Sequence, residues 1–475
     1  MIIIGREKEK EILTKIIKSK DAEFLVVFGR RRVGKTYLIQ HCCSDVDYYF
    51  ECTGMKDGKL SFQLSHFIKQ FSSLFYQGIN LEKPKNWQDA FELLTKQIKQ
   101  IPIDKTIVLF FDELPWLASK RSGFLSVLDH YWNTVWKNMT NLKLIVCGSA
   151  ASWLLNNIIN AKGGLHNRIT QSMLLEPFTL CETNKFLKNK GFLLSKKQVL
   201  DVYMVMGGIP YYLNQLSKTE SISQNIDRIC FKKDGLLFSE FSRIFKSLFE
   251  KYDVYIKIIR CIAEKRYGIT FNDLTKIMQK KAGGRLLERL QELEVTGFIQ
   301  KRPIFGKKRE HIYTIVDEYC LFYLKWIDKK MPIIKGQDLF SKIKKSPSFL
   351  SWSGYSFEGI CYKHVDKIID KLHIKNVVNS VLNWNIKTDE EGAQIDLIFD
   401  RDDDAINICE IKQNEELFVI NKDVAKNIIK KVDLFKESTK TKKQIFINII
   451  ASNGIKENAW SEELISQTVT LDDLF

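Results

Sequence analysis

The stretch Gly29-Arg-Arg-Arg-Val-Gly-Lys-Thr36 decides the fold of the N-terminal part of this chain. Its two glycines are separated by four residues, and lysine and threonine follow the second, which is the spacing of a P-loop. The apolar run Phe24–Phe28 comes directly before it and is typical of a strand buried on both faces. Residues Thr36–Cys42 are expected to form a helix. A strand, a glycine turn and a helix in this order are the context that a P-loop requires.

The residue types in this loop suit the phosphates of a nucleotide. Glycines let backbone N–H groups turn onto phosphate oxygens, and the start of the following helix adds a favourable dipole. We expect Lys35 to reach the β- and γ-phosphates and the Thr36 hydroxyl to ligate Mg²⁺. A glycine turn with a surface lysine is the alternative. The sequence therefore predicts an ATP and Mg²⁺ site made of Gly29, Arg30, Arg31, Arg32, Val33, Gly34, Lys35, Thr36 and Tyr37.

Two acidic residues, Asp112 and Glu113, follow a second apolar run at residues 106–111. A carboxylate at the carboxyl end of a parallel strand lies beside the P-loop crevice. We expect Asp112 to contribute to the nucleotide site by holding Mg²⁺ through water, and Glu113 to orient or deprotonate the attacking water. The alternative is a helix cap with a first-turn acid. A third apolar run at 142–147, with helical patterns between the runs, predicts an α/β fold with a parallel sheet.

The C-terminal part carries a second set of acids, in two apolar strands that flank an aspartate-rich turn. The strands are Ala393–Phe399 and Ile406–Lys412. A hairpin centred on Asp403 places Asp396 opposite Glu410, and strand alternation then puts Glu410 and Lys412 on one face. Two facing carboxylates can hold Mg²⁺, while a lysine positions the attacking water and offsets developing charge. This arrangement predicts a metal-dependent nuclease site.

The region between these sites changes from strands to helices. Residues 180–235 have a helical pattern throughout, and three short helices are expected at 252–264, 271–279 and 283–296. A basic β-hairpin follows, and three helices with a hairpin indicate a winged helix. Its basic side chains suit phosphate contacts, although a lid or a protein-docking surface is the alternative. These side chains are Lys280, Lys281, Arg285, Lys301, Arg302, Lys307, Lys308 and Arg309.

Several short motifs together resemble the archaeal-type ATPase family, which belongs to the AAA+/STAND branch of P-loop NTPases and is related to origin-binding ATPases. The resemblance spans about residues 2–320. Beside the P-loop, it is carried by Gly5-Arg-Glu7, Phe111-Asp-Glu-Leu114, Cys147-Gly-Ser-Ala150 and Gly207-Gly-Ile-Pro-Tyr-Tyr212.

The resemblance implies further site residues. Ser149 would sense the γ-phosphate, and Arg168 would be an arginine finger, which requires an ATP-dependent homo-oligomer if it acts in trans. Read from the residues alone, Ser149 is a turn serine and Arg168 a surface cation. The motif at residues 207–210 would form a lid beside the nucleotide, with Gly5 and Arg6 near the adenine.

The C-terminal part resembles the PD-(D/E)XK nucleases, which these ATPases often carry. Asp396, Glu410 and Lys412 match the core of that superfamily. The resemblance implies that Glu358, in Tyr355-Ser-Phe-Glu-Gly-Ile360, supplies a further metal-binding acid from the first helix. Because members of such folds often lose activity and keep a binding role, cleavage and binding both remain open.

Four segments are therefore expected. A P-loop core at 1–180 precedes a helical lid at 181–240, a winged helix at 241–330, and a smaller α/β nuclease-like domain at 331–475.

The bulk properties limit the partners. The net charge of +16 favours an anionic partner, most simply DNA. The ten cysteines include no C-x-x-C, which argues against a zinc site and a disulfide scaffold and favours reduced thiols in a cytoplasm. No apolar run approaches the ~20 residues that span a bilayer.

The function predicted first is ATP hydrolysis coupled to action on nucleic acid, with a Mg²⁺-dependent nuclease-like domain. A STAND-type switch, whose C-terminal domain binds a protein partner without cleaving, is the main alternative. A DNA-binding regulator with a structural ATP site is the third.

Overall fold

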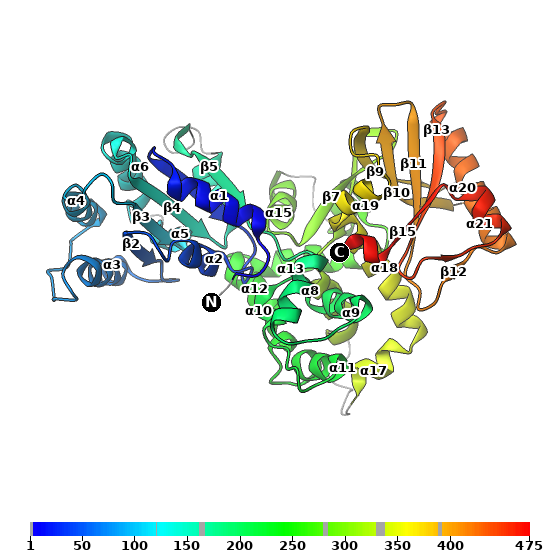
Figure 1. Cartoon of the computed structure of the whole chain (residues 1–475), viewed down its shortest axis with the longest axis horizontal. Coiled ribbons are helices and arrows are strands. Elements are labelled where there is room, and N and C mark those ends of the chain that lie inside the picture. The colour runs from blue at the N-terminus through cyan, green and yellow to red at the C-terminus, as the bar shows by residue number, and fades with distance from the viewer. Residues whose placement is uncertain (1–2, 120, 161–166, 279–283, 329–337, 388–391) are drawn as a thin grey trace. The chain divides into compact units, whose positions relative to one another are not determined.

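The computed structural model describes residues 3–119, 121–160, 167–278, 284–328, 338–387 and 392–475 (Figure 1). The chain divides into two compact units, Met1–Pro177 and Phe178–Phe475, and each is described by itself. Lys280 and Lys281, which were expected to contact phosphate, lie outside the described residues. Within the described residues, no helix combines the length and apolar character needed to cross a membrane.

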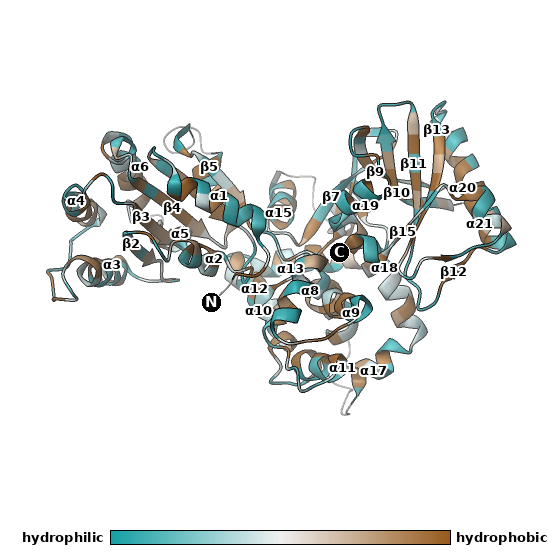
Figure 2. Ribbon diagram, viewed as in Figure 1, coloured by the Kyte–Doolittle hydropathy of each residue, from teal (hydrophilic) through white to brown (hydrophobic). Residues whose placement is uncertain are grey.

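The first unit is built on a parallel sheet of five strands in the order β2-β3-β4-β1-β5. Every residue of β3 and β4 is buried, because helices cover both faces of a parallel sheet. Figure 2 shows these central strands as mainly hydrophobic, whereas the surrounding helices have one hydrophobic and one hydrophilic side. The strands are β1 (Glu23–Phe28), β2 (Tyr48–Thr53), β3 (Ile107–Asp112), β4 (Leu142–Gly148) and β5 (Gln171–Leu174). The α/β fold with a parallel sheet, predicted from the apolar runs, is confirmed.

The helices of the first unit connect these strands. A capped start fixes one of them: the Asn86 side chain accepts a hydrogen bond from the Asp89 amide at the beginning of α4. The helices are α1 (Glu7–Lys18), α2 (Lys35–Cys42), α3 (Leu60–Phe75), α4 (Trp87–Ile98), α5 (Leu114–Leu117), α6 (Phe124–Thr134) and α7 (Ala151–Leu154).

The second unit begins with helices, as the pattern of residues 180–235 predicted. Three of them start with capping boxes, at Thr179 before α8, at Ser195 before α9 and at Ser221 before α11. The first helices are α8 (Leu180–Asn189), α9 (Lys196–Met206), α10 (Pro210–Leu213), α11 (Ile222–Ile226) and α12 (Glu240–Leu248). The next are α13 (Tyr252–Ala263), α14 (Phe271–Ile277), α15 (Gly284–Val295), α16 (Glu318–Phe322), α17 (Leu339–Lys344), α18 (Pro347–Lys363) and α19 (Val365–Lys371).

A mixed sheet of eight strands completes this unit, in the order β15-β13-β11-β10-β9-β7-β8-β6. Helices α20 (Lys422–Thr439) and α21 (Ala459–Leu464) accompany it, as does a separate strand pair of β12 (Phe418–Val419) and β14 (Ile455–Lys456). The eight strands are β6 (Ile269–Thr270), β7 (Ile299–Ile304), β8 (Lys307–Ile315), β9 (Val378–Lys387), β10 (Gly392–Arg401), β11 (Ala405–Lys412), β13 (Gln444–Ala451) and β15 (Gln467–Thr470).

The β7–β8 hairpin is joined to the C-terminal strands. Ile304 of β7 pairs in parallel with Asn383 of β9, and the Phe305 amide donates a hydrogen bond of 2.8 Å to the Asn383 carbonyl. Helices α13 to α15 followed by this hairpin have the order expected of a winged helix, and that assignment stays a prediction. So does the division of residues 181–475 into a helical lid, a winged helix and a nuclease-like domain, since Phe178–Phe475 pack as one unit.

One basic side chain of the hairpin differs from its expected role. Arg302 is only 8% exposed, and its guanidinium lies 3.5 Å from the ring centroid of Tyr362 on α18. A cation buried on an aromatic face is a packing contact. Arg302 is therefore not presented to a phosphate, whereas Lys301, Lys307 and Arg309 are exposed.

Candidate functional site

The P-loop is shaped by glycines at both ends. Gly29 follows β1 with φ of 149°, and a Cβ added there would lie 2.3 Å from the Leu175 carbonyl oxygen. Gly34 has φ of 94° and caps the start of α2. Side chains are disfavoured at such φ values, so these glycines let the loop turn between strand and helix.

Lys35 and Thr36 point into this loop from the first turn of α2. The Lys35 ammonium, on a residue 6% exposed, donates hydrogen bonds of 3.1 Å to the carbonyls of Gly29 and Arg30. The Thr36 hydroxyl donates a hydrogen bond of 2.6 Å to Oδ2 of Asp112. The structure thus brings the P-loop and the end of β3 together, as their places in a parallel sheet require.

Asp112 is buried at the end of β3, and three donors satisfy it. Besides Thr36, its Oδ1 accepts from the Glu113 amide at 2.8 Å and from Sγ of Cys147 at 2.7 Å. Burial, and then the charge of Asp112, raise the pKa of the Cys147 thiol well above its ordinary value, which keeps that thiol a donor. The cysteine contact has no counterpart in the predicted site. Its only signal in the sequence is that Cys147 ends the neighbouring apolar strand.

Glu113 occupies a strained position directly after Asp112. Its φ of 46° is left-handed, which is uncommon for a residue with a side chain. Its carboxylate accepts hydrogen bonds of 2.8 and 2.9 Å from the Ser149 hydroxyl and one of 3.2 Å from the Ser149 amide. The structure therefore places Ser149, expected at the γ-phosphate, against the expected catalytic acid.

The other predicted residues of this site have different degrees of exposure. Val33 is buried, and its carbonyl accepts a hydrogen bond of 3.2 Å from the Arg6 guanidinium, so Arg6 braces the loop. Arg31 and Arg32 are half-buried, while Tyr37 is 46% exposed. Arg168 is exposed and comes two residues after the undescribed segment 161–166.

A second site lies in the other unit, around a cavity of about 320 Å³. The hairpin of β10 and β11 pairs Leu397 with Cys409, the register that a turn centred on Asp403 requires. The cavity is lined by side chains from α18, β10, β11 and α20. These include Glu358, Asp396, Glu410, Lys412 and Lys431.

Local structure aims Asp396 at this cavity. A β-bulge interrupts the β9–β10 pairing between Ile395 and Ile398, and bulges commonly redirect a side chain next to a site. The Tyr362 hydroxyl donates a hydrogen bond of 2.8 Å to the Asp396 carbonyl, which fixes β10 to α18. The Ile411 amide donates to Oδ2 of Asp396 at 3.0 Å.

The acids of the cavity differ in how closely cations approach them. Glu410 accepts hydrogen bonds from Lys412 at 2.7 Å and from Lys431 at 2.7 and 2.9 Å. Glu358 is 14% exposed, and the Arg266 guanidinium approaches it only to 3.9 Å. Burial, and then the charge of Asp396, raise the pKa of Glu358 well above its ordinary value. Burial, and then the charge of Glu410, do the same to the pKa of Asp396.

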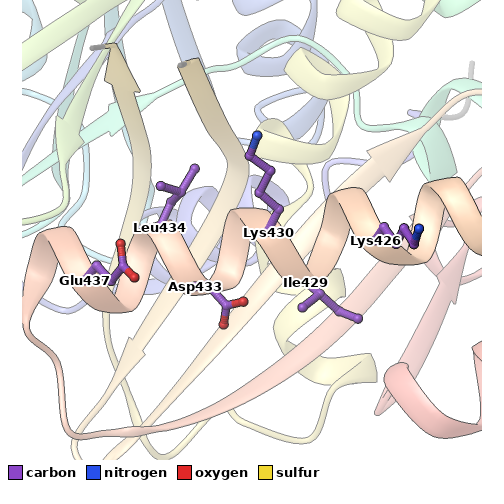
Figure 3. Close-up of a pocket in the computed structure, with 6 residues that line it drawn as sticks. All are labelled: Lys426, Ile429, Lys430, Asp433, Leu434 and Glu437. Atoms are coloured by element: carbon purple, nitrogen blue, oxygen red, sulfur yellow. The ribbon is translucent and has the colours of Figure 1, made fainter. Parts of the chain in front are cut away.

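Sequence reasoning found three acids and one lysine of this cavity and missed two cations. Lys431 follows Lys430, and successive side chains of a helix point in different directions. Lys430 lines a shallow hollow of about 290 Å³ along one face of α20 (Figure 3), whereas Lys431 contacts Glu410. The helical sequence pattern of α20 is the signal that predicts different directions for these two side chains. Arg266 is distant in sequence, and tertiary packing alone brings it to the cavity.

Both sites contain carboxylate or hydroxyl oxygens, which are the ligand atoms that Mg²⁺ prefers. In the first, a threonine hydroxyl adjoins a carboxylate, and in the second, three carboxylates face one cavity. Among the described residues, no three or more His, Cys, Asp or Glu side chains form a group that could hold a metal ion as they stand. The donor chemistry therefore fits Mg²⁺, while the ligand positions would have to adjust to it.

Comparison with known proteins identifies the class of the N-terminal site. Residues 3–216 match a family described as an ATPase domain predominantly from Archaea. An uncharacterized protein of Methanocaldococcus jannaschii is 25% identical over 416 residues, covering 85% of each chain. The Walker-type ATPase of Pyrococcus abyssi is 19% identical, with a TM-score of 0.50 over 68% of this chain and 96% of that structure. The ORC2 protein of Aeropyrum pernix is 13% identical, with a TM-score of 0.43 over 68% and 94%.

The family match agrees with the geometry of the first site. The likeness to the Pyrococcus abyssi ATPase shows a shared fold, and the family match extends from Ile3 to Leu216, through the P-loop, Asp112 and the glycine motif at residues 207–210. Residues 3–216 therefore contain an archaeal-type ATPase domain, and the chain is a P-loop ATPase.

Proposed function

We propose that this ATPase acts on nucleic acid and that its C-terminal site cleaves it with Mg²⁺. The observation that carries the proposal is the cavity where Glu358, Asp396 and Glu410 converge from three elements beside Lys412. A divalent cation held by these acids would supply an activated water and offset charge on the phosphate. The net charge of +16 supports a polyanionic substrate.

The residues of the cavity have two different proposed roles, metal binding and positioning of the attacking water. Glu358, Asp396 and Glu410 hold the cation, and their positions on a helix and two paired strands keep the ligands on rigid elements. Lys412 lies 2.7 Å from Glu410, where its ammonium can position the attacking water and neutralise charge that develops on the phosphate.

In the ATPase domain, we propose that Lys35 and the loop amides bind the phosphates. Thr36 and Asp112 hold the Mg²⁺ of the nucleotide, and Glu113 orients the attacking water. Arg168, exposed on the surface, stabilises the transferring phosphoryl group of a neighbouring copy. A homo-oligomer that forms with ATP follows from that role.

We also propose that α13–α15 and the β7–β8 hairpin form a winged helix that binds nucleic acid. Lys301, Lys307, Arg309 and Arg285 are exposed there and can contact phosphates. Because Arg302 is buried, we leave it out of this set of phosphate-binding side chains.

The test is cleavage of single-stranded, double-stranded and supercoiled DNA by the full chain, with and without Mg²⁺ and ATP. We expect Mg²⁺-dependent cleavage that Glu410→Ala abolishes and loss of ATP hydrolysis in Lys35→Ala. Absence of Mg²⁺-dependent cleavage of every DNA form would contradict the nuclease proposal.

A slow ATP-dependent switch is the second candidate, and one observation favours it. Ser149 holds Glu113 with its hydroxyl and its amide, so the expected catalytic acid must leave this partner before it acts on water. A switch would show a single turnover followed by slow cycling, with no stimulation by DNA. Steady multiple turnover stimulated by DNA would exclude it.

A further inference from the structure

The acid cavity contains two side chains from outside the C-terminal module. Arg266 and Tyr267 belong to the turn between α13 and β6, and both line the same 320 Å³ cavity as Glu358 and Asp396. The turn closes with a hydrogen bond of 3.0 Å from the Gly268 amide to the Lys265 carbonyl. These two residues lie about 90 to 145 positions before the three acids in the chain.

The turn leads directly into a β-strand that is paired in the sheet. Residues Ile269 and Thr270 of β6 pair with Tyr313 and Ile312 of β8. Strand β8 pairs with β7, which joins β9 of the C-terminal sheet. The turn therefore leads into the same continuous sheet that carries Asp396 and Glu410, which fixes Arg266 and Tyr267 relative to the cavity.

Arg266 is placed to bind a phosphate beside the acids. Its side chain is 50% exposed, and its contact with Glu358, at 3.9 Å, is at the outer limit of an ion pair. Most of the planar guanidinium fork therefore remains available for two parallel hydrogen bonds to phosphate oxygens. A cation at the rim of the cavity also compensates the negative charge that the three acids present to a polyanion.

Tyr267 adds an aromatic surface next to this cation. It is 51% exposed, and the Arg266 guanidinium lies 5.5 Å from its ring centroid. An exposed ring beside a phosphate-binding group is a stacking platform for a nucleobase. In a duplex the faces of the bases are covered by their neighbours, so such a platform selects strands with unpaired bases.

We propose that Arg266 and Tyr267 are substrate-binding residues that make the C-terminal site selective for single-stranded nucleic acid. Arg266 binds a backbone phosphate next to the one at the acids, and Tyr267 stacks on an unpaired base of the same strand. This inference rests on the proposed function of the cavity and specifies its substrate.

The test measures binding before cleavage. Fluorescently labelled single-stranded and duplex DNA of equal length are titrated with the full chain, with Ca²⁺ replacing Mg²⁺. We expect Arg266→Ala and Tyr267→Ala each to weaken single-strand binding about tenfold and to change duplex binding less than about twofold. Tyr267→Phe should bind like the wild type, and Arg266→Lys should fall between wild type and Arg266→Ala, because it keeps the charge without the fork.

Matched controls locate the effect. Arg243→Ala removes an exposed arginine from α12, and Tyr76→Ala removes a tyrosine that is 38% exposed in the first unit; both should retain selective single-strand binding. Unchanged ATP hydrolysis and thermal unfolding identify variants that keep the fold. Wild-type binding by Arg266→Ala and Tyr267→Ala, or equal loss for single strands and duplex, would overturn the inference.

Cleavage with Mg²⁺ separates the two proposals. If the wild type cleaves and Asp396→Asn does not, while Arg266→Ala and Tyr267→Ala bind and cleave like the wild type, the cavity is a nuclease site and the selectivity proposal is wrong. If no DNA form is cleaved but the two variants lose single-strand binding, the selectivity survives as a binding property and the nuclease proposal fails.

Discussion

The nucleotide site and the C-terminal cavity both place buried carboxylates near lysines, but they satisfy those carboxylates differently. Asp112 accepts hydrogen bonds from Thr36, Glu113 and Cys147. In the cavity, Glu358 has a cation only at 3.9 Å, and its pKa is raised by burial and by the charge of Asp396. The first carboxylate is stabilised by the protein itself. The ionised form of the second is disfavoured by burial and by Asp396, and a bound cation would stabilise that form.

Loss of the P-loop lysine should have the largest effect on the first region. Lys35→Ala removes the ammonium proposed to bind the β- and γ-phosphates, so we expect ATP hydrolysis to fall about 100-fold or more. Steady-state ATPase assays measure it, with Lys8→Ala, at an exposed position of α1, as the control. Hydrolysis within a few-fold of the wild type would contradict the assignment of this lysine.

Ser149→Ala should have a smaller effect at the same site. The variant removes the hydroxyl that donates to both oxygens of Glu113 and leaves only the amide contact. A hydrogen bond to a charged group contributes about 1.5–3 kcal/mol, so an acid that needs this partner for its position would lower kcat about tenfold or more. An increase in kcat would instead show that Ser149 restrains Glu113, as the switch requires.

Neutralising one acid in each region should change stability in opposite directions. Asp112→Asn weakens three hydrogen bonds and should lower the free energy of unfolding by about 1 kcal/mol. Glu358→Gln removes a carboxyl whose ionised form is disfavoured by burial and by Asp396, so the variant avoids the cost of protonating this group on folding; near neutral pH and without divalent cations, it should raise the free energy of unfolding by on the order of 1 kcal/mol. Urea denaturation in EDTA measures both, and the same sign for both variants would refute the comparison.

A buried histidine at the end of α18 makes the stability of the second unit depend on pH. His364 Nε2 accepts a hydrogen bond of 3.0 Å from the Leu180 amide, and Nδ1 donates to the Ile360 carbonyl at 2.8 Å. Burial lowers the pKa of His364 below its usual 6.5, so the unfolded chain takes up a proton first as the pH falls. Stability therefore declines below about pH 6.5, by at most about 1.4 kcal/mol per pH unit for one proton.

The variant His364→Gln cannot titrate, so the comparison isolates this group. Urea midpoints of wild type and variant between pH 5 and 8 should converge as the pH decreases. A difference in stability that is constant over this range would show that His364 does not titrate as proposed.

The two regions also differ in how far the sequence predicts them. The strands around the P-loop are continuous apolar runs, and β1, β3 and β4 begin and end within about one residue of the predicted limits. Strand β5 was missed because only one of its four residues is buried, which leaves no apolar run to detect. Local motifs also place Lys35, Thr36 and Asp112, because strand order brings them to one sheet edge.

The cavity required tertiary information that a local pattern does not contain. The pairing of Asp396 with Glu410 follows from hairpin symmetry, so the register was predictable. Arg266 arrives through the β6–β8–β7–β9 connection, which joins segments far apart in the chain. The burial of Arg302 on Tyr362 also depends on this docking, and its charge had suggested an exposed role.

The most direct test of two separate chemistries is a paired assay on wild type and Asp396→Asn. Both proteins are assayed for ATP hydrolysis and for Mg²⁺-dependent cleavage of single-stranded DNA in the same preparation. The proposed function predicts equal ATP hydrolysis by the two proteins, with cleavage by the wild type alone. Cleavage by neither protein, or by both at the same rate, would contradict the assignment of the acid cavity as a nuclease site.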